Sequence, residues 1–157
     1  MRLKWLSLVV VSGLAVTLAG CLTTIDWLEL ALEAAQAVLS GLHTIDNPKV
    51  AAAAHDYAVS AAARVGQVAE IEERGGTEAE KAGAVRVAVY QMARPQIPAQ
   101  YRELNRALDR LEKRMNRIYN RGGAAMSSSR SGSPTILVNS PDRARLEDIK
   151  RRAGEIR

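Results

Sequence analysis

The chain of 157 residues has a single cysteine, two histidines and no phenylalanine. One cysteine cannot form an intramolecular disulfide, and two histidines are too few for a histidine-rich metal site. Aromatic residues make up only 4% of the chain, so we do not expect a large aromatic-lined ligand pocket. Hydrophobic residues at 47% and charged residues at 25% nonetheless fit one ordinary globular domain. The composition favours a modest aliphatic core and excludes collagen-like and wholly disordered chains.

Catalytic motifs are also missing, because no Gly-rich phosphate loop and no HExxH, GxSxG or CxxC pattern occurs. A metal shared by His43, Asp46 and His55 is conceivable across one helix connection, but surface or helix-end histidines are the simpler interpretation. His55 and Asp56 are neighbours in a predicted helix, so we expect their side chains to point in different directions. A carboxylate run at one helix end is interpreted as solvated: Glu70, Glu72 and Glu73. The sequence therefore predicts a protein that is not an enzyme and holds no metal or cofactor.

The first residues have the layout of a secretory signal. Arg2 and Lys4 precede an apolar run from Trp5 to Ala19, which counts 15 residues and is shorter than a helix needs to cross a bilayer. We predict a signal peptide over residues 1–20. The alternative is an uncleaved transmembrane anchor from about residue 3 to residue 22.

The tetrapeptide Leu18-Ala19-Gly20-Cys21 resembles the lipobox of bacterial lipoproteins. The resemblance implies cleavage before Cys21, a diacylglyceryl group on its thiol, further acylation such as palmitate, and a lipid-anchored protein that faces the periplasm. Two or three acyl chains at one residue anchor stably, whereas one chain binds only marginally. Leu22, in place of Asp, resembles the enterobacterial pattern for sorting to the outer membrane, so we expect that membrane rather than the inner one.

Hydrophobic periodicity and capping residues predict an all-α protein, a small antiparallel bundle of about four helices within residues 21–121. An N-cap at Thr23-Thr24 opens the first helix and Asn47-Pro48 opens the second. Gly75-Gly76 ends the second helix, and a capping box from Thr77 to Glu80 starts the third. Pro95 to Pro98 is predicted to form a turn before the fourth. The predicted helices cover residues 24–40, 48–73, 78–93 and 98–120.

The fourth of these helices has a regular apolar seam. Its members alternate at spacings of three and four residues: Tyr101, Leu104, Leu108, Leu111, Met115 and Ile118. Such a stripe is produced both by a helix within an intramolecular bundle and by a coiled coil between chains. We favour the bundle, and the coiled coil stays open.

The C-terminal region starts with Gly122-Gly123, which we expect to stop the fourth helix. Residues 122–134 have flexible Gly/Ser linker composition, and residues 135–157 comprise a short apolar patch and an amphipathic helix. The patch at 135–138 could dock on the bundle or pair with a partner strand. The sequence leaves open whether residues 124–157 are ordered before they bind a partner.

Charge is segregated along the chain. Residues 21–92 carry five Lys or Arg against ten Asp or Glu, whereas residues 93–157 carry fifteen against seven. Six arginines recur every three or four residues in the fourth helix and form a basic face: Arg102, Arg106, Arg110, Arg114, Arg117 and Arg121. This face is either solvated, or matched by the acidic segments at 26–33 and 70–80, or a binding surface for anionic lipid, lipopolysaccharide or glycan. Nucleic acid is disfavoured because no aromatic side chains interleave the arginines.

These features predict a membrane-anchored envelope lipoprotein that acts as a structural or interaction module, through helix–helix contacts and its basic face. Its partners would be the membrane, through the lipid anchor, and an envelope protein or a second copy of the chain. One alternative is an exclusion or lysis-associated lipoprotein encoded by a phage, prophage or plasmid, a class that it resembles in size and address alone. A second alternative is a module that binds anionic surfaces.

Overall fold

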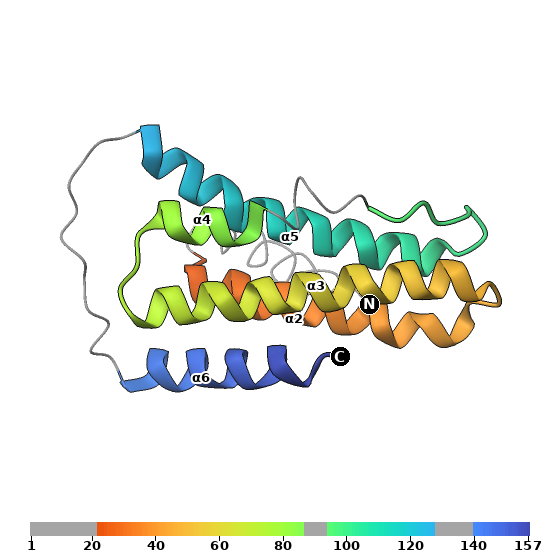
Figure 1. Cartoon of the computed structure of the whole chain (residues 1–157), viewed down its shortest axis with the longest axis horizontal. Helices are drawn as coiled ribbons and strands as arrows, with labels where there is room; N and C mark the ends of the chain where they lie inside the picture. The colour runs from red at the N-terminus through yellow and green to blue at the C-terminus, as the bar shows by residue number, and fades with distance from the viewer. Residues whose placement is uncertain (1–21, 87–93, 128–139) are drawn as a thin grey trace, which may run out of the picture.

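The computed structural model describes residues 22–86, 94–127 and 140–157, and within these ranges the chain is helical without a β-strand. The predicted all-α class is confirmed. The elements, in order, are α2 (Thr24–Gly41), the 3₁₀ turn η2 (Leu42–Thr44), α3 (Pro48–Glu73), α4 (Glu78–Arg86), α5 (Arg102–Ser127) and α6 (Ser140–Glu155). Figure 1 shows α2 and α3 in the middle of the bundle, with α4 and α5 on one side and α6 on the other.

Helices α2 and α5 run antiparallel to each other. Near one end of the bundle, a Cβ on Gly41 would lie 3.8 Å from Leu104, near the start of α5. Towards the other end, Arg114 of α5 donates to the backbone carbonyl of Leu30. The first turns of α2 therefore lie beside the second half of α5. Leu30 and Arg114 are 84 positions apart in the sequence, so this pairing brings together distant segments.

Local capping explains where α2 and α3 begin. The Thr23 hydroxyl accepts a hydrogen bond from the Asp26 amide at 3.2 Å, and the Asp26 carboxylate accepts one from the Thr23 amide at 2.7 Å. Asn47 caps α3 through its side-chain oxygen, which accepts from the amides of Lys49 at 3.0 Å and Val50 at 3.3 Å. Both predicted caps are confirmed, and the second predicted helix has the predicted bounds.

The core is aliphatic, as the lack of phenylalanine requires. Its largest fully buried side chains are Leu28, Leu32, Leu108, Leu111, Met115, Leu146, Ile149, Val38, Val65, Val68 and Val85. Small residues let helices approach closely, and a Cβ built on Gly66 of α3 would lie 3.2 Å from the Cβ of Ala153 in α6. Helix α6 is therefore part of the core, which makes the bundle larger than the predicted four helices.

Helix α5 differs from its predicted bounds at both ends. The segment from Pro98 to Tyr101 forms a turn, in which the Tyr101 amide donates to the Pro98 carbonyl at 3.0 Å, so α5 begins at Arg102 and not at Pro98. At the other end, the predicted stop at Gly122-Gly123 is wrong, because the helix continues to Ser127. Glycine in a helix costs only about 1 kcal/mol relative to alanine, and two alanines follow the pair directly.

The third predicted helix begins at its predicted capping box, where the Glu80 carboxylate accepts from the Thr77 amide at 2.7 Å. Gly75, with φ of 71°, makes the preceding turn in a conformation that glycine tolerates best. Helix α4 is described to Arg86, and the predicted remainder over 87–93 lies outside the described residues. Also outside them are the predicted signal peptide, the lipobox with Cys21, linker residues 128–134 and the apolar patch at 135–138.

Among the described helices, none combines the length and apolar character needed to cross a membrane.

Candidate interaction surface on helix α5

The apolar seam of α5 belongs to the interior of the bundle. Five of its six predicted members are buried, and Tyr101 is half-buried against the core. The seam packs between α2 and α4 of the same chain. In the structure the stripe is therefore a seam within the bundle of one chain. The seam is occupied and does not offer an apolar surface to a partner.

The basic face of α5 lies on the outside of the bundle. Arg102, Arg106, Arg110 and Arg117 are exposed, and Arg114 is half-buried. Arg121 lies in α5, but its side chain is outside the described part of the structure. Arg106 pairs with Glu103 of its own helix at 2.6 Å. The other three exposed arginines make no ion pair with any side chain in the described ranges.

The acidic groups of α2 are neutralised mainly by α6, not by the basic face. Arg145 of α6 contacts the carboxylates of Asp26 at 2.6 Å and Glu29 at 2.8 Å. The hydrogen bond from Arg145, helped by hydrogen bonds from Thr23, lowers the pKa of Asp26 to about 2. Of the α5 arginines whose side chains the structure describes, only Arg114 reaches an α2 acid, with Glu33 at 3.9 Å. The interpretation that α2 matches the basic face holds for this one arginine.

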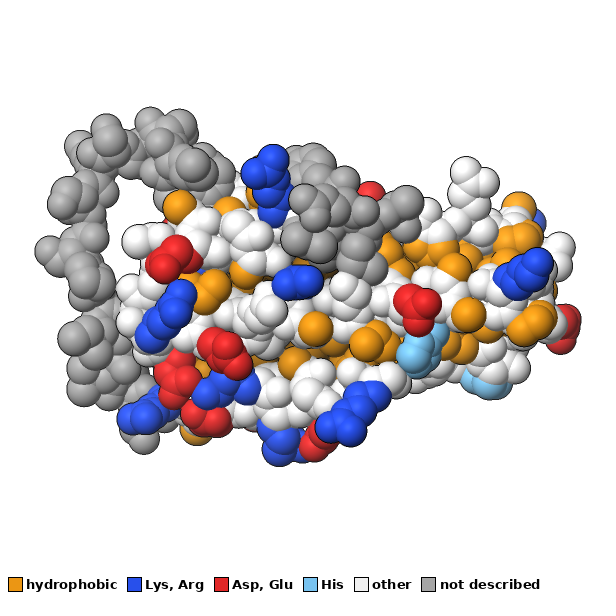
Figure 2. All heavy atoms as spheres, viewed as in Figure 1, with side chains coloured by type: hydrophobic (Ala, Val, Ile, Leu, Met, Phe, Trp, Pro, Cys, Tyr) orange, Lys and Arg blue, Asp and Glu red, His pale blue; other side chains and the backbone are white. Residues whose placement is uncertain are grey.

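Two of the three carboxylates at the end of α3, Glu72 and Glu73, are engaged in ion pairs, which corrects their interpretation as solvated, whereas Glu70 is exposed as expected. Glu72 pairs with Lys81 of α4, whose side chain is only 6% exposed. Burial acts to lower the pKa of Lys81, but its bonds to Glu72 and Glu78 raise it overall. Glu73 contacts Lys150 of α6 at 2.5 Å. In Figure 2, acidic and basic side chains intermix over α3 and α6 near the end where α6 begins.

A shallow hollow lies where the basic face meets the first turns of α2. It is lined by Trp27, Arg110, Lys113, Arg114, Asn116, Arg117 and Asn120. Trp27 is half-buried and packs against the core. Desolvation lowers the pKa of the Arg114 guanidinium, and the positive charge of Arg110 acts in the same direction. The hollow therefore concentrates positive charge beside an aromatic ring.

Sequence reasoning missed the part that Trp27 plays in this hollow. Trp27 stands next to the apolar positions Ile25 and Leu28, so its local sequence does not distinguish it from a core residue. Only the antiparallel pairing of α2 with α5 places its ring beside arginines 110 to 117. An arginine band and a half-exposed tryptophan near the predicted membrane anchor are a usable signal when the pairing is known.

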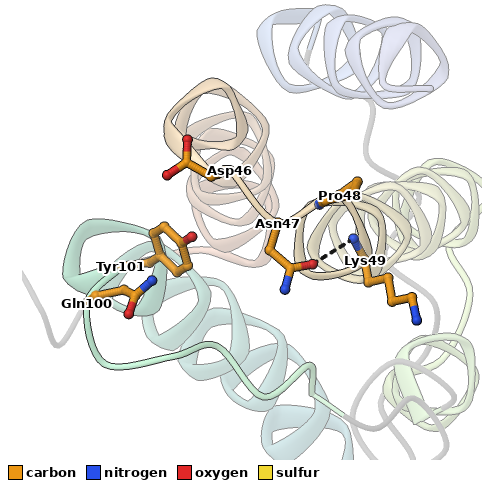
Figure 3. Close-up of a pocket in the computed structure, with 6 residues that line it drawn as sticks. All are labelled: Asp46, Asn47, Pro48, Lys49, Gln100 and Tyr101. Carbon is orange, nitrogen blue, oxygen red and sulfur yellow. Dashed lines mark hydrogen bonds between the residues drawn. The ribbon is translucent and has the colours of Figure 1, made fainter.

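A second hollow lies at the opposite end of the bundle (Figure 3). Its lining comes from the α2–α3 connection and the turn before α5: Asp46, Asn47, Pro48, Lys49, Gln100 and Tyr101. The Asn47 side chain is already used as the cap of α3, and Figure 3 shows Lys49 extending away from the hollow. The remaining groups are neutral or single charges, and they do not form an acid–base pair suited to catalysis.

The histidines do not form a metal site with their neighbours. His43 bonds to the Ser40 carbonyl in its own turn, and His55 Nε2 lies 3.1 Å from the carbonyl oxygen of Arg157. No group of three metal-ligating side chains occurs among the residues that the structure describes. One local expectation is wrong, since His55 Nδ1 lies 3.4 Å from the Asp56 carboxylate. Both residues face solvent, which is consistent with surface groups.

Comparison with known proteins gives no relative for this chain: no family model, no curated protein and no solved structure matches it.

Proposed function

We propose that this protein is a bacterial envelope lipoprotein, anchored through Cys21, that works as a non-enzymatic interaction module. The observation that supports this most directly is the exposed basic face of α5. Three arginines there have no acidic partner within the described residues, although other basic side chains of the chain are paired with acids. Like charges at a spacing of four residues repel one another on a helix surface, and a patch of one sign attracts ligands of the opposite charge, which supports a binding role.

Burial of the α5 seam limits the kind of contact that α5 can make with a partner. Because the apolar stripe of α5 is used inside the bundle, helix–helix contacts with another chain have no unoccupied seam on α5 to use. Recognition through α5 therefore relies on charge. The proposed partner is an anionic component of the envelope, and the proposed location is the periplasmic side of the outer membrane.

The anchor is tested by expressing the full chain in a bacterium beside its Cys21→Ser variant. Intact mass and membrane fractionation are measured for both. We expect the wild-type product to begin at Cys21, to carry the added mass of acyl chains and to stay with the outer-membrane fraction. The Cys21→Ser product should retain residues 1–20 and carry no acyl mass. An uncleaved, unacylated wild-type product would overturn the lipoprotein proposal.

A further inference from the structure

We propose that the hollow formed by Trp27, Arg110, Lys113 and Arg117 binds the phosphate headgroups of anionic lipids in the membrane that holds Cys21. This inference rests on the proposed lipid anchor and adds a partner and a docking orientation to it. The bundle would meet the membrane through the side that carries the start of α2 and the second half of α5. The first half of the basic face, with Arg102 and Arg106, would lie farther from the membrane.

The distance from the anchor to the bundle is the first argument. Helix α2 begins at Thr24, three residues after Cys21. Three residues span at most about 10 Å when fully extended. The capping box at Thr23 and the contact of Arg145 with Asp26 hold the first turn of α2 to the rest of the bundle. A lipid on Cys21 would therefore keep this end of the bundle at the level of the headgroups.

The antiparallel pairing supplies the second argument, because it brings the second half of α5 to the same end. Arg114 bonds to the Leu30 carbonyl, one helical turn from Trp27. Arg110, Lys113 and Arg117 are exposed around it, and none has an ion pair with a described acid. Two of the acids of α5, Asp109 and Glu112, turn to the other flank and pair with Arg94. Positive charge thus gathers beside the start of α2, where a headgroup phosphate would be reached.

Trp27 has a side chain and a position that suit a membrane surface. Tryptophan is favoured at the membrane–water interface, where its ring can lie among the headgroups. Trp27 is half-exposed at the rim of the basic hollow, within the second turn of a helix that starts beside the anchor. Each basic side chain near an anionic membrane surface contributes favourably to binding, and salt weakens that contribution. A ring and three cations at one end form a surface that suits this interface.

The test uses Trp27 as its own reporter. The chain has two tryptophans, and Trp5 leaves with residues 1–20 on cleavage. Mature lipidated protein is reconstituted into vesicles of phosphatidylcholine, alone or mixed with phosphatidylglycerol, and Trp27 fluorescence is recorded with brominated lipids and with acrylamide. We expect a blue shift, quenching by brominated lipid and protection from acrylamide only in the anionic vesicles. High salt should reverse all three, and inorganic phosphate without phosphatidylglycerol should produce none of them.

Two matched charge reversals locate the surface. Arg110→Glu with Arg117→Glu changes the proposed site, and Arg102→Glu with Arg106→Glu changes the same helix face at the far end. All four side chains are exposed, so both variants should fold, which circular dichroism checks. We expect the first pair to weaken the response to phosphatidylglycerol by at least about tenfold, and the second pair by less than about threefold. Equal effects of the two pairs, or a Trp27 that stays open to acrylamide in anionic vesicles, would overturn the proposal.

Failure of the anchor and failure of the hollow give different results. If Cys21 carries no acyl chains, intact mass shows it before any vesicle is made. The full chain, with Trp5→Leu to leave Trp27 as the reporter, is then added to preformed vesicles and tested by cosedimentation. Salt-sensitive binding that depends on Arg110 and Arg117 would keep the hollow and reject the anchor. An acylated protein whose Trp27 ignores phosphatidylglycerol would keep the anchor and reject the hollow. If a pull-down instead shows binding to an acidic protein, and Trp27 does not respond to phosphatidylglycerol, the assignment of the hollow to lipid would also be rejected.

Discussion

Two sides of the bundle use basic residues in opposite ways. On the α6 side, Arg145 and Lys150 each contact two carboxylates, so cations and acids are matched and partly shielded from water. We call this the matched side. On the outer side of α5, which we call the unmatched side, Arg110 and Arg117 face solvent without an acid in reach among the described residues. Both sides carry the same kind of side chain. The difference shows that position in the tertiary fold, not residue type, decides whether a cation stabilises the structure or stays available for binding.

The largest expected effect comes from removing the apolar contact beneath the matched side. Ile149 of α6 is fully buried, so Ile149→Ala should lower the free energy of unfolding by about 2–4 kcal/mol. Urea denaturation of the full chain measures this change. Arg117→Ala, on the unmatched side, serves as the control and should shift the same quantity by less than about 0.5 kcal/mol. A small loss for Ile149→Ala would mean that α6 contributes little to the core in solution.

A smaller effect is expected from removing one matched cation. Arg145→Met keeps the aliphatic part of the side chain but leaves Asp26 and Glu29 without their partner. Because the Arg145 side chain is 36% exposed, solvent screens these pairs, and we expect a loss of about 1 kcal/mol. Arg110→Met is the matched substitution on α5 and should leave the urea midpoint almost unchanged. If both variants lose the same stability, the contrast between the two sides is wrong.

The pH dependence should reveal the same pairing through Asp26. Its pKa is lowered from the ordinary 3.8 to about 2, so its contribution to stability is complete above pH 3.8 and disappears as the pH falls towards 2. We expect Asp26 to account for about 1–2 kcal/mol of acid destabilisation after solvent screening. Asp26→Asn should be less stable than wild type at neutral pH, and the two should converge near pH 2. A constant difference across this range would contradict the lowered pKa.

The last prediction concerns the far end of the unmatched side and is a gain of stability. If α5 runs through residues 122 and 123 in solution, replacing both glycines by alanine should stabilise it by at most about 1 kcal/mol per site. Far-ultraviolet circular dichroism should show a gain in helix, and the urea midpoint should rise slightly. A loss of helix or of stability would instead support a turn at Gly122-Gly123.

Prediction from sequence succeeded where the signal is local. The capping pairs at Thr23 and Asn47, the capping box at Thr77 and the buried seam of α5 depend on residues within a few positions of one another. It failed at Gly122-Gly123, where two glycines were weighed as a stop, although the following alanines favour the helix. It also failed for Glu72 and Glu73, because their partners Lys81 and Lys150 come from other helices.

For the candidate surface, too, sequence predicted the local features and not those that depend on how the helices pack. The spacing of the arginines placed them on one helix face, which α-helical periodicity requires. Their exposure, and the presence of Trp27 at their side, depend on which helix covers which flank of α5. The acids of α2 could pair with basic side chains of either α5 or α6, and charge alone does not choose between these two helices. Shape and apolar burial select α6 as the partner of Asp26 and Glu29.

The sequence by itself determined the helical class, the caps, the aliphatic core and the presence of a basic face, because each follows from the period of the helix and from side-chain chemistry. Only the tertiary structure decided that α6 joins the core, that Arg145 pairs with Asp26 and Glu29, and that Trp27 lies beside Arg114 and Arg117. The reason is physical: which helices pack together depends on the simultaneous burial of apolar faces that are distant in the sequence. Charges then pair with whatever that packing brings within reach.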